Sequence, residues 1–187
     1  EPKILQMLID NPTEDLALVD KYKTWMDGTV VKISDDFSIS HFISKADFNY
    51  IDVDEYYKTV NIYKFSKLFL GNVYVPFLEA YATALGDNEY YEQVLKVIVN
   101  LDMKHLKALP LNGEKWYEID DAQDLDTANL IFAEPAERYK LLSQRYGGYW
   151  RFDHLKDFCY LVNPFFPPES LSNELKFSLN RLVQSYP

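Results

Sequence analysis

Cysteine, glycine and long apolar runs are all scarce in this sequence, and each scarcity excludes a class of protein. The 187 residues include 1 Cys, so an internal disulfide and a zinc site made of several cysteines are excluded. Cys159 itself is most simply a buried, small apolar residue. The three histidines are far apart and lack metal-ligand spacing, so we interpret each as structural or exposed.

No run of 18 apolar residues occurs, and no basic segment followed by an apolar one opens the chain. We therefore expect neither a membrane span nor a signal peptide, and a cytoplasmic location. The chain starts without Met, directly in the helical spacing of Pro2–Ile9. We expect it to be a piece of a longer protein.

Glycine is too rare for a phosphate-binding loop. The chain has 6 glycines, and Gly28 is the only one before Gly71, so neither G-x-G-x-x-G nor P-loop spacing exists. Basic residues are also in the minority, with 19 Lys and Arg against 29 Asp and Glu and a net charge of -10. Such a field repels nucleic acid, but small anions can still bind where a metal ion bridges them to carboxylates.

The apolar content is that of a folded domain, because 48% of the residues are hydrophobic and 16% are aromatic. Their spacing predicts an α/β fold. Strands are predicted at residues 16–19, 29–33, 38–43, 60–65, 106–109 and 116–119. Helices are predicted at residues 2–9, 66–85, 89–100, 123–145 and 170–183. Pro76 and Pro135 are expected to interrupt their helices, and Asp27-Gly28 favours a hairpin-like reversal.

The densest group of candidate functional residues is Trp116–Leu125, in which a predicted strand runs into carboxylates directly before a helix. Strand ends in open α/β sheets are where ligands bind, and a carboxylate there can hold Mg²⁺ together with phosphate oxygens. The alternative is structural. Asp120 or Asp121 then only caps the helix, and Asp124 only complements the helix dipole.

Two further segments carry candidate binding residues. In Val19–Gly28, Lys21 and Lys23 could meet a phosphate, while aromatic and acidic side chains could hold an ammonium group; the alternative is a solvated loop. In Tyr56–Tyr63, Asn61 lies within an apolar strand, where its amide must find partners. It could orient a ligand or equally join a neighbouring loop.

Three stretches in this order resemble the second half of a small-molecule nucleotidyltransferase. The similarity is greatest to the cytidylyltransferases that make CDP-choline or CMP-phosphonates. The stretches are VDKYKTWMDGTVV, KTVNIYKFS and WYEIDDAQDLDTA, and the resemblance covers roughly residues 1–133. It implies part of a Rossmann-like sheet with an inserted β element, from which the glycine-rich amino-terminal half is missing. It also implies transfer of CMP from CTP to a phosphate or phosphonate oxygen, with Mg²⁺ and release of pyrophosphate.

The same resemblance implies roles for individual residues. Asp120 matches a metal-binding carboxylate, and Lys21 and Lys58 are the candidate catalytic cations that offset charge on the acceptor. The remaining candidates are expected to contact the substrate. They are Asp20, Trp25, Asp27, Asn61, Tyr63 and Glu118.

Residues 134–187 form a helical linker that is similar, from Arg145 onward, to the entry segment of a pyridoxal-phosphate aminotransferase of the histidinol-phosphate type. This resemblance implies a fused enzyme that forms a homo-oligomer, with pyridoxal phosphate bound only in the fused domain. We expect the 187 residues alone to be inactive. The acceptor is predicted to be 2-aminoethylphosphonate or phosphocholine. The alternatives are a non-catalytic assembly or linker fragment, and a sugar-phosphate nucleotidyltransferase.

Overall fold

The computed structural model describes residues 2–86, 88, 90–103, 106–145, 152, 155–156, 163 and 165–184. The chain divides into two compact units, Glu1–Arg145 and Tyr146–Pro187, which are described separately. The predicted burial of Cys159 lies outside the described residues. The predicted domain boundary after residue 133 rests on the resemblance and stays a prediction.

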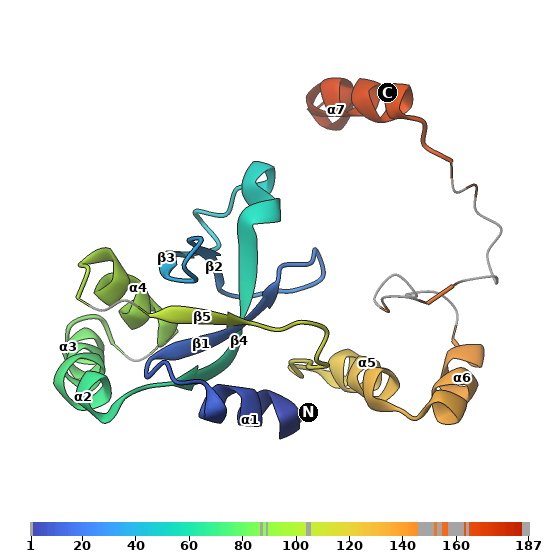
Figure 1. The fold of residues 1–187 in the computed structure, drawn as a ribbon. Coiled ribbons are helices and arrows are strands. Elements are labelled where there is room, and N and C mark those ends of the chain that lie inside the picture. The colour runs from blue at the N-terminus through green and yellow to red at the C-terminus, as the bar shows by residue number, and fades with distance from the viewer. Residues whose placement is uncertain are drawn as a thin grey trace. The chain divides into compact units, whose positions relative to one another are not determined.

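The first unit is built on a mixed sheet of five strands, which confirms the α/β prediction (Figure 1). The strands are β1 (Leu16–Lys21), β2 (Val30–Ile33), β3 (Ile39–Ile43), β4 (Tyr56–Lys64) and β5 (Lys107–Pro110). Their order across the sheet is β3-β2-β4-β1-β5. Only β1 and β5 run parallel, and the other neighbouring pairs are antiparallel.

Strand β1, which lies between β4 and β5, is buried on both faces, in keeping with its uninterrupted apolar run Leu16–Val19. Ala17 and Val19 face a larger core that includes helix α4 (Glu92–Asn100). Leu16 and Leu18 face a smaller core that includes helix α1 (Pro2–Asp10). The alternation along one strand therefore places α1 and α4 on opposite faces of the sheet.

A long helical segment follows β4. It consists of α2 (Lys67–Phe69), one π-helical stretch (Leu70–Tyr74) and α3 (Val75–Leu85). Pro76 was expected to interrupt this helix, but it lies in the first turn of α3, where its missing N–H is tolerated. Pro135 does separate two helices, α5 (Ala122–Phe132) and α6 (Pro135–Ser143), as predicted.

Two predictions of local structure were wrong. Residues 116–119 form no strand, and Trp116 and Tyr117 are held instead by side-chain contacts with Asp20 and Trp25. Asp27-Gly28 does not join a hairpin, since β1 and β2 both pair with β4 and not with each other. The helix predicted at roughly 89–100 is present as α4, which begins at Glu92.

The segment Lys67–Leu85 has the length and apolar composition that could cross a membrane, and it is the one such helix among the described residues. One helix of this kind is weak evidence for a span. Phe69 and Tyr74 are buried in the larger core, and Phe77 and Leu78 pack against it. The segment is therefore also a covering helix of the sheet.

The second unit contains helix α7 (Glu169–Gln184), which confirms the helix predicted at residues 170–183. Its apolar side chains are at least partly exposed, among them Phe177 and Val183. The predicted aminotransferase-like segment runs from Arg145 to Pro187, and much of its part before α7 lies outside the described residues.

Candidate functional site

A cavity of about 570 Å³ lies in the first unit, between α1, the middle of β4 and the segment that precedes α5. Its lining is mainly apolar and aromatic, with the polar side chains of Asn61 and Glu118 among it. Such a composition is typical of small-molecule sites. The lining residues are Pro2, Ile4, Leu5, Val60, Asn61, Ile62, Trp116, Tyr117, Glu118 and Phe132.

A bulge in β4 gives Asn61 its position in the cavity wall. The pairing of β1 with β4 shifts register between Ala17 and Val19, which pair with Tyr63 and Thr59. Asn61 lies inside this shift with a φ of 59°, in the left-handed region that asparagine adopts more readily than most residues. Bulges next to functional sites commonly redirect one side chain. Here the bulge leaves Asn61 without a partner residue in the pairing of β1 with β4.

The Asn61 amide and the Lys58 ammonium bind the two oxygens of one carboxylate. Asn61 Nδ2 donates to Glu118 Oε1 at 2.6 Å, and Lys58 Nζ lies 3.4 Å from Glu118 Oε2. Glu118 is on the segment before α5, 57 residues beyond Asn61, so tertiary folding assembles this group. Three residues predicted as site residues, Lys58, Asn61 and Glu118, are thus in direct contact.

Lys58 is a buried cation, because its residue is 2% exposed. Its Nζ donates to the Thr59 carbonyl oxygen at 2.7 Å. Gly28 lies directly over the ammonium, since a Cβ atom at that position would be 3.3 Å from Lys58 Nζ. A buried cation requires anionic or carbonyl partners, and the Glu118 carboxylate supplies the negative charge.

Two aromatic side chains of the cavity wall are fixed by residues of the 19–28 segment and its strand. Asp20 Oδ2 accepts a 2.8 Å hydrogen bond from Trp116 Nε1. Trp25 stacks on Tyr117, with ring centroids 5.2 Å apart and an interplanar angle of 18°. Asp20 and Trp25, both predicted as site residues, therefore stand behind the cavity wall.

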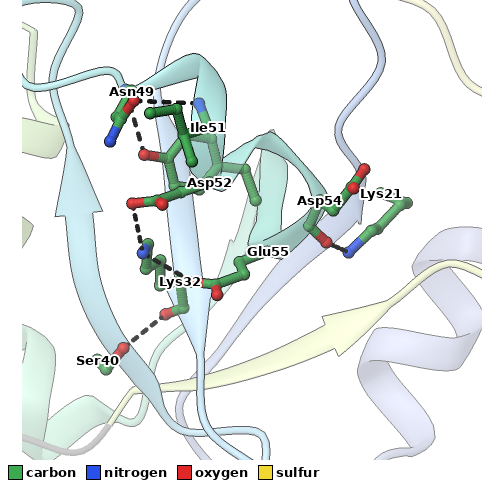
Figure 2. A network of polar contacts seen from close by, with 9 residues as sticks. Lys21, Lys32, Ser40, Asn49, Ile51, Asp52, Asp54 and Glu55 are labelled. Atoms are coloured by element: carbon green, nitrogen blue, oxygen red, sulfur yellow. Dashed lines mark hydrogen bonds and ion pairs between the residues drawn. The ribbon is translucent and has the colours of Figure 1, made fainter.

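Lys21 is directed elsewhere. Its Nζ donates to the Asp54 carbonyl oxygen and lies 4.5 Å from the centroid of the Tyr57 ring. Asp54 belongs to a 3-10 helix, Tyr50–Glu55, that Lys32 also holds through Asp52 and Glu55 at 3.1 and 2.7 Å. Figure 2 shows both lysines reaching toward this helix. The structure thus gives Lys21 a local partner, and its catalytic role stays a prediction.

The acidic residues at the start of α5 differ in whether their carboxylates accept hydrogen bonds from nearby groups. Asp121 Oδ1 accepts from the backbone N–H groups of Gln123 and Asp124, so Asp121 is the N-cap. Asp124 accepts from the Asp120 N–H and from the Tyr117 hydroxyl. The exposed Asp120 carboxylate has no hydrogen bond or ion pair within the described residues. Asp27, which was also predicted as a site residue, accepts from the Gly28 N–H at 2.8 Å.

Tyr63 lies away from the cavity, on the face of the sheet covered by α4. Its hydroxyl lies 3.4 Å from Glu92 Oε1, and Glu92 is 5% exposed. Burial raises the pKa of Glu92, and the positive charge of Lys58 partly offsets this effect. Burial also raises the pKa of the Tyr63 hydroxyl, with the Glu92 carboxylate as the next cause, and the same two causes raise the pKa of Tyr91 to about 12.

Three structural features of the site and its surroundings were not predicted. Glu92 was missed because a glutamate at the start of a helix is usually a solvated residue that complements the helix dipole. The sequence did offer the spacing, since Glu92 lies three residues before Leu95 and six before Ile98, on the helix face that the structure buries. The part of α1 in the cavity wall and the Trp25–Tyr117 stack depend on tertiary contacts that the sequence pattern does not contain.

The described parts of the chain contain no group of three or more His, Cys, Asp or Glu side chains that could hold a metal ion. Asp120 could instead supply a single carboxylate to a metal site that the substrate completes. Magnesium is commonly bound by one or two carboxylates together with substrate phosphates, and an exposed carboxylate without a protein partner can serve as one of them.

Comparison with known proteins gives one informative similarity. The chain is 26% identical, over 188 residues, to the CMP-5'-(3-aminopropyl)phosphonate synthase of Streptomyces rubellomurinus (strain ATCC 31215). The chain is similar to a phosphonate-related synthase. The match covers 100% of this chain but 30% of the relative, so this chain spans less than a third of that enzyme's length. No protein-family model matches the sequence. The similarity suggests a related nucleotidyltransferase of the transferase class.

Proposed function

We propose that this chain forms the acceptor-binding part of a cytidylyltransferase that transfers CMP from CTP to a small aminoalkyl phosphonate or phosphate. The observation that carries this proposal is the cavity, where an aromatic wall adjoins a buried ammonium group reached through Asn61 and Glu118. A short phosphonate with an amino group requires both surfaces. The name of the Streptomyces relative supports the same class of acceptor.

Each part of the acceptor has a matching surface in this proposal. Lys58 offsets the charge of the phosphonate, because its ammonium lies within ion-pair distance of a cavity-lining residue. Trp116 and Tyr117 pack against the alkylamine and can interact with its ammonium through their ring faces. Asp20 and Trp25 hold these rings in place, so their effect on substrate is through positioning.

The proposed reaction is an in-line displacement at the α-phosphorus of CTP. One acceptor oxygen forms the new P–O bond, the bond to the bridging oxygen of the β-phosphate breaks, and pyrophosphate leaves. The protein has little covalent work to do, so positioning and charge neutralisation carry the catalysis. Asp120 would hold Mg²⁺, which when bound neutralises phosphate charge.

The rest of the enzyme is also part of the proposal. The triphosphate cradle would come from a segment outside these 187 residues, which alone would be inactive. A fused pyridoxal-phosphate aminotransferase would supply the homo-oligomer. We place the enzyme in the cytoplasm, with neither nucleic acid nor membrane as a partner.

The test is pyrophosphate release from CTP by the natural-length protein, with 2-aminoethylphosphonate, 3-aminopropylphosphonate, phosphocholine and glucose 1-phosphate as acceptors. We expect turnover with the amine-bearing acceptors and none with glucose 1-phosphate. Turnover only with glucose 1-phosphate would replace the proposal by a sugar-phosphate nucleotidyltransferase. No turnover with any acceptor, at saturating Mg²⁺ and CTP, would favour a non-catalytic assembly role.

A further inference from the structure

We propose that the Glu118 carboxylate occupies the position in which Lys58 and Asn61 bind the phosphonate of the acceptor, and that the acceptor displaces it. This inference rests on the proposed function. It adds that the Glu118 carboxylate competes with the acceptor's phosphonate for the same binding position. Glu118 then acts neither as a ligand of the acceptor's amine nor as a purely structural residue.

The geometry of the contact supports an anion site. Asn61 Nδ2 and Lys58 Nζ each contact a different oxygen of the same carboxylate, at 2.6 and 3.4 Å. A phosphonate presents a similar pair of adjacent anionic oxygens on a tetrahedral centre. One amide donor and one cation, both directed at a pair of oxygens, can therefore bind either group.

The Lys58–Glu118 contact is also longer than an optimal charge-assisted hydrogen bond. Its 3.4 Å separation is longer than the 2.7–2.9 Å that is usual for charge-assisted hydrogen bonds. The Lys58 side chain is 3% exposed and that of Glu118 is 41% exposed. The cation is therefore fixed in the fold, whereas the carboxylate lies at the surface and can rotate into water.

Access is consistent with this exchange. Asn61 and Glu118 both line the cavity, while Lys58 lies behind them and does not. A ligand in the cavity that displaced the Glu118 carboxylate would therefore lie beside the Lys58 ammonium. Glu118 thus keeps the buried cation paired in the empty site, where an unpaired buried charge would be costly.

The test compares two ligands that differ only in the amino group, ethylphosphonate and 2-aminoethylphosphonate. Their dissociation constants are measured by calorimetry on the natural-length protein and on Glu118→Gln, with Mg²⁺ and the unreactive α,β-methylene analogue of CTP present. Glutamine keeps a carbonyl oxygen for Asn61 but removes the competing charge. We expect both ligands to bind Glu118→Gln about three- to fivefold more tightly, as the loss of a partly exposed ion pair predicts.

The other outcomes overturn the inference. If Glu118 binds the amine, Glu118→Gln weakens 2-aminoethylphosphonate and leaves ethylphosphonate unchanged. If Glu118 is only structural, neither dissociation constant changes. Lys58→Met is the matched variant and should weaken both ligands more than tenfold, and equal binding by Lys58→Met would remove the anion site altogether. Urea unfolding of each variant checks that the fold is intact.

Failure of the inference is separable from failure of the proposed function. Pyrophosphate release by the wild-type protein tests the function and does not depend on the Glu118 result. If the wild-type protein releases pyrophosphate but Glu118→Gln binds ethylphosphonate no more tightly than wild type does, the proposed function holds and competition by Glu118 is refuted. Tighter binding by Glu118→Gln without pyrophosphate release leaves a phosphonate-binding site that does not transfer CMP.

Discussion

The indole Nε1 of Trp116 donates a 2.8 Å hydrogen bond to Oδ2 of Asp20, across 96 positions of the sequence. Asp20 is near the end of β1, opposite Lys58 of β4 in the sheet. One bond thus connects the cavity wall to the strand beside the buried cation. It restricts the orientation of the Trp116 ring, which also packs against the smaller core.

The first prediction concerns this bond. Asp20→Ala and Trp116→Phe should each lower the free energy of unfolding, and the double variant should lose less than the sum of the two. The coupling should be about 1 kcal/mol or more, because the acceptor is charged and partly buried. Urea unfolding of the four proteins measures it. Additive losses would mean that the bond has no energetic role.

The second prediction uses two glycines with similar backbones. Gly28 and Gly113 have φ values of 91° and 95°, so alanine is strained at both positions, at a cost of about 1–2 kcal/mol. Only Gly28 has a neighbour within 4 Å of the added Cβ, the Lys58 ammonium at 3.3 Å. Gly28→Ala should therefore lower the free energy of unfolding by about 1 kcal/mol more than Gly113→Ala.

The Lys58→Ala background provides the control for this comparison. Without the ammonium, the additional cost of Gly28→Ala should disappear, and the two glycine variants should then be equally destabilised. An additional cost that persists in this background would assign it to the backbone of the loop and not to the contact with Lys58.

The third prediction concerns pH. Because burial raises the pKa of Glu92 in the fold, the folded protein holds this proton to higher pH than the unfolded chain does. The stability that depends on protonated Glu92 is full below the ordinary carboxyl pKa of 4.5 and is lost as pH rises through the raised value. The titratable groups that interact with this carboxyl include Lys58, Glu118 and the hydroxyls of Tyr63, Tyr74 and Tyr91.

Glu92→Gln removes that dependence. Relative to wild type, it should gain in free energy of unfolding between pH 4.5 and 8, measured with urea at a series of pH values. Glu79→Gln makes the same change of charge on the exposed face of α3 and serves as the control. A difference between Glu92→Gln and wild type that stays constant over this range would contradict the assignment.

The fourth prediction separates the two adjacent aspartates. Asp120→Asn should reduce cytidylyl transfer by roughly a hundredfold or more, since a metal-stabilised charge is worth several kcal/mol in the transition state. Its free energy of unfolding should not change, because the Asp120 carboxylate makes no hydrogen bond or ion pair with any described residue. Asp35→Asn, on the exposed turn between β2 and β3, controls for the loss of charge.

Asp121→Ala should show the opposite pattern. It removes the N-cap of α5 and should cost about 1 kcal/mol of stability. Normal turnover by Asp120→Asn at saturating Mg²⁺ would reduce Asp120 to a second capping residue. These measurements require the natural-length protein, in which turnover can be observed.

The sequence predicts most of the elements because their periodicity is local. The short apolar run Leu16–Val19 favours a strand buried on both faces, and Pro135 favours a break or a kink in its helix; the structure has the strand and the break. The error at residues 116–119 has a physical cause, since strand propensity does not reveal whether a segment pairs with a sheet or is held by side-chain contacts. Trp116 and Tyr117 are instead held by side-chain contacts with Asp20 and Trp25.

The site was predictable in its members but not in its arrangement. Asn61 draws attention because a polar amide in an apolar strand needs partners, and its partner is Glu118. The two-residue bulge that redirects it depends on the register of β1 against β4, which no local pattern encodes. The sequence could not show which of Lys21 and Lys58 lies beside the cavity, because the direction of a lysine side chain depends on which face of its strand is covered.

Helix α1 joins the sheet through side chains and not through a strand ladder. Ile4 and Leu8 pack in the smaller core, and Ile4 and Leu5 also line the cavity. Elements held in this way open locally at lower free energy than the strands they cover. A ligand in the cavity adds contacts that exist only while α1 is docked. Deuterium uptake by the amides of Ile4–Leu8 should therefore slow when the cavity is filled, and it reports occupancy without any turnover.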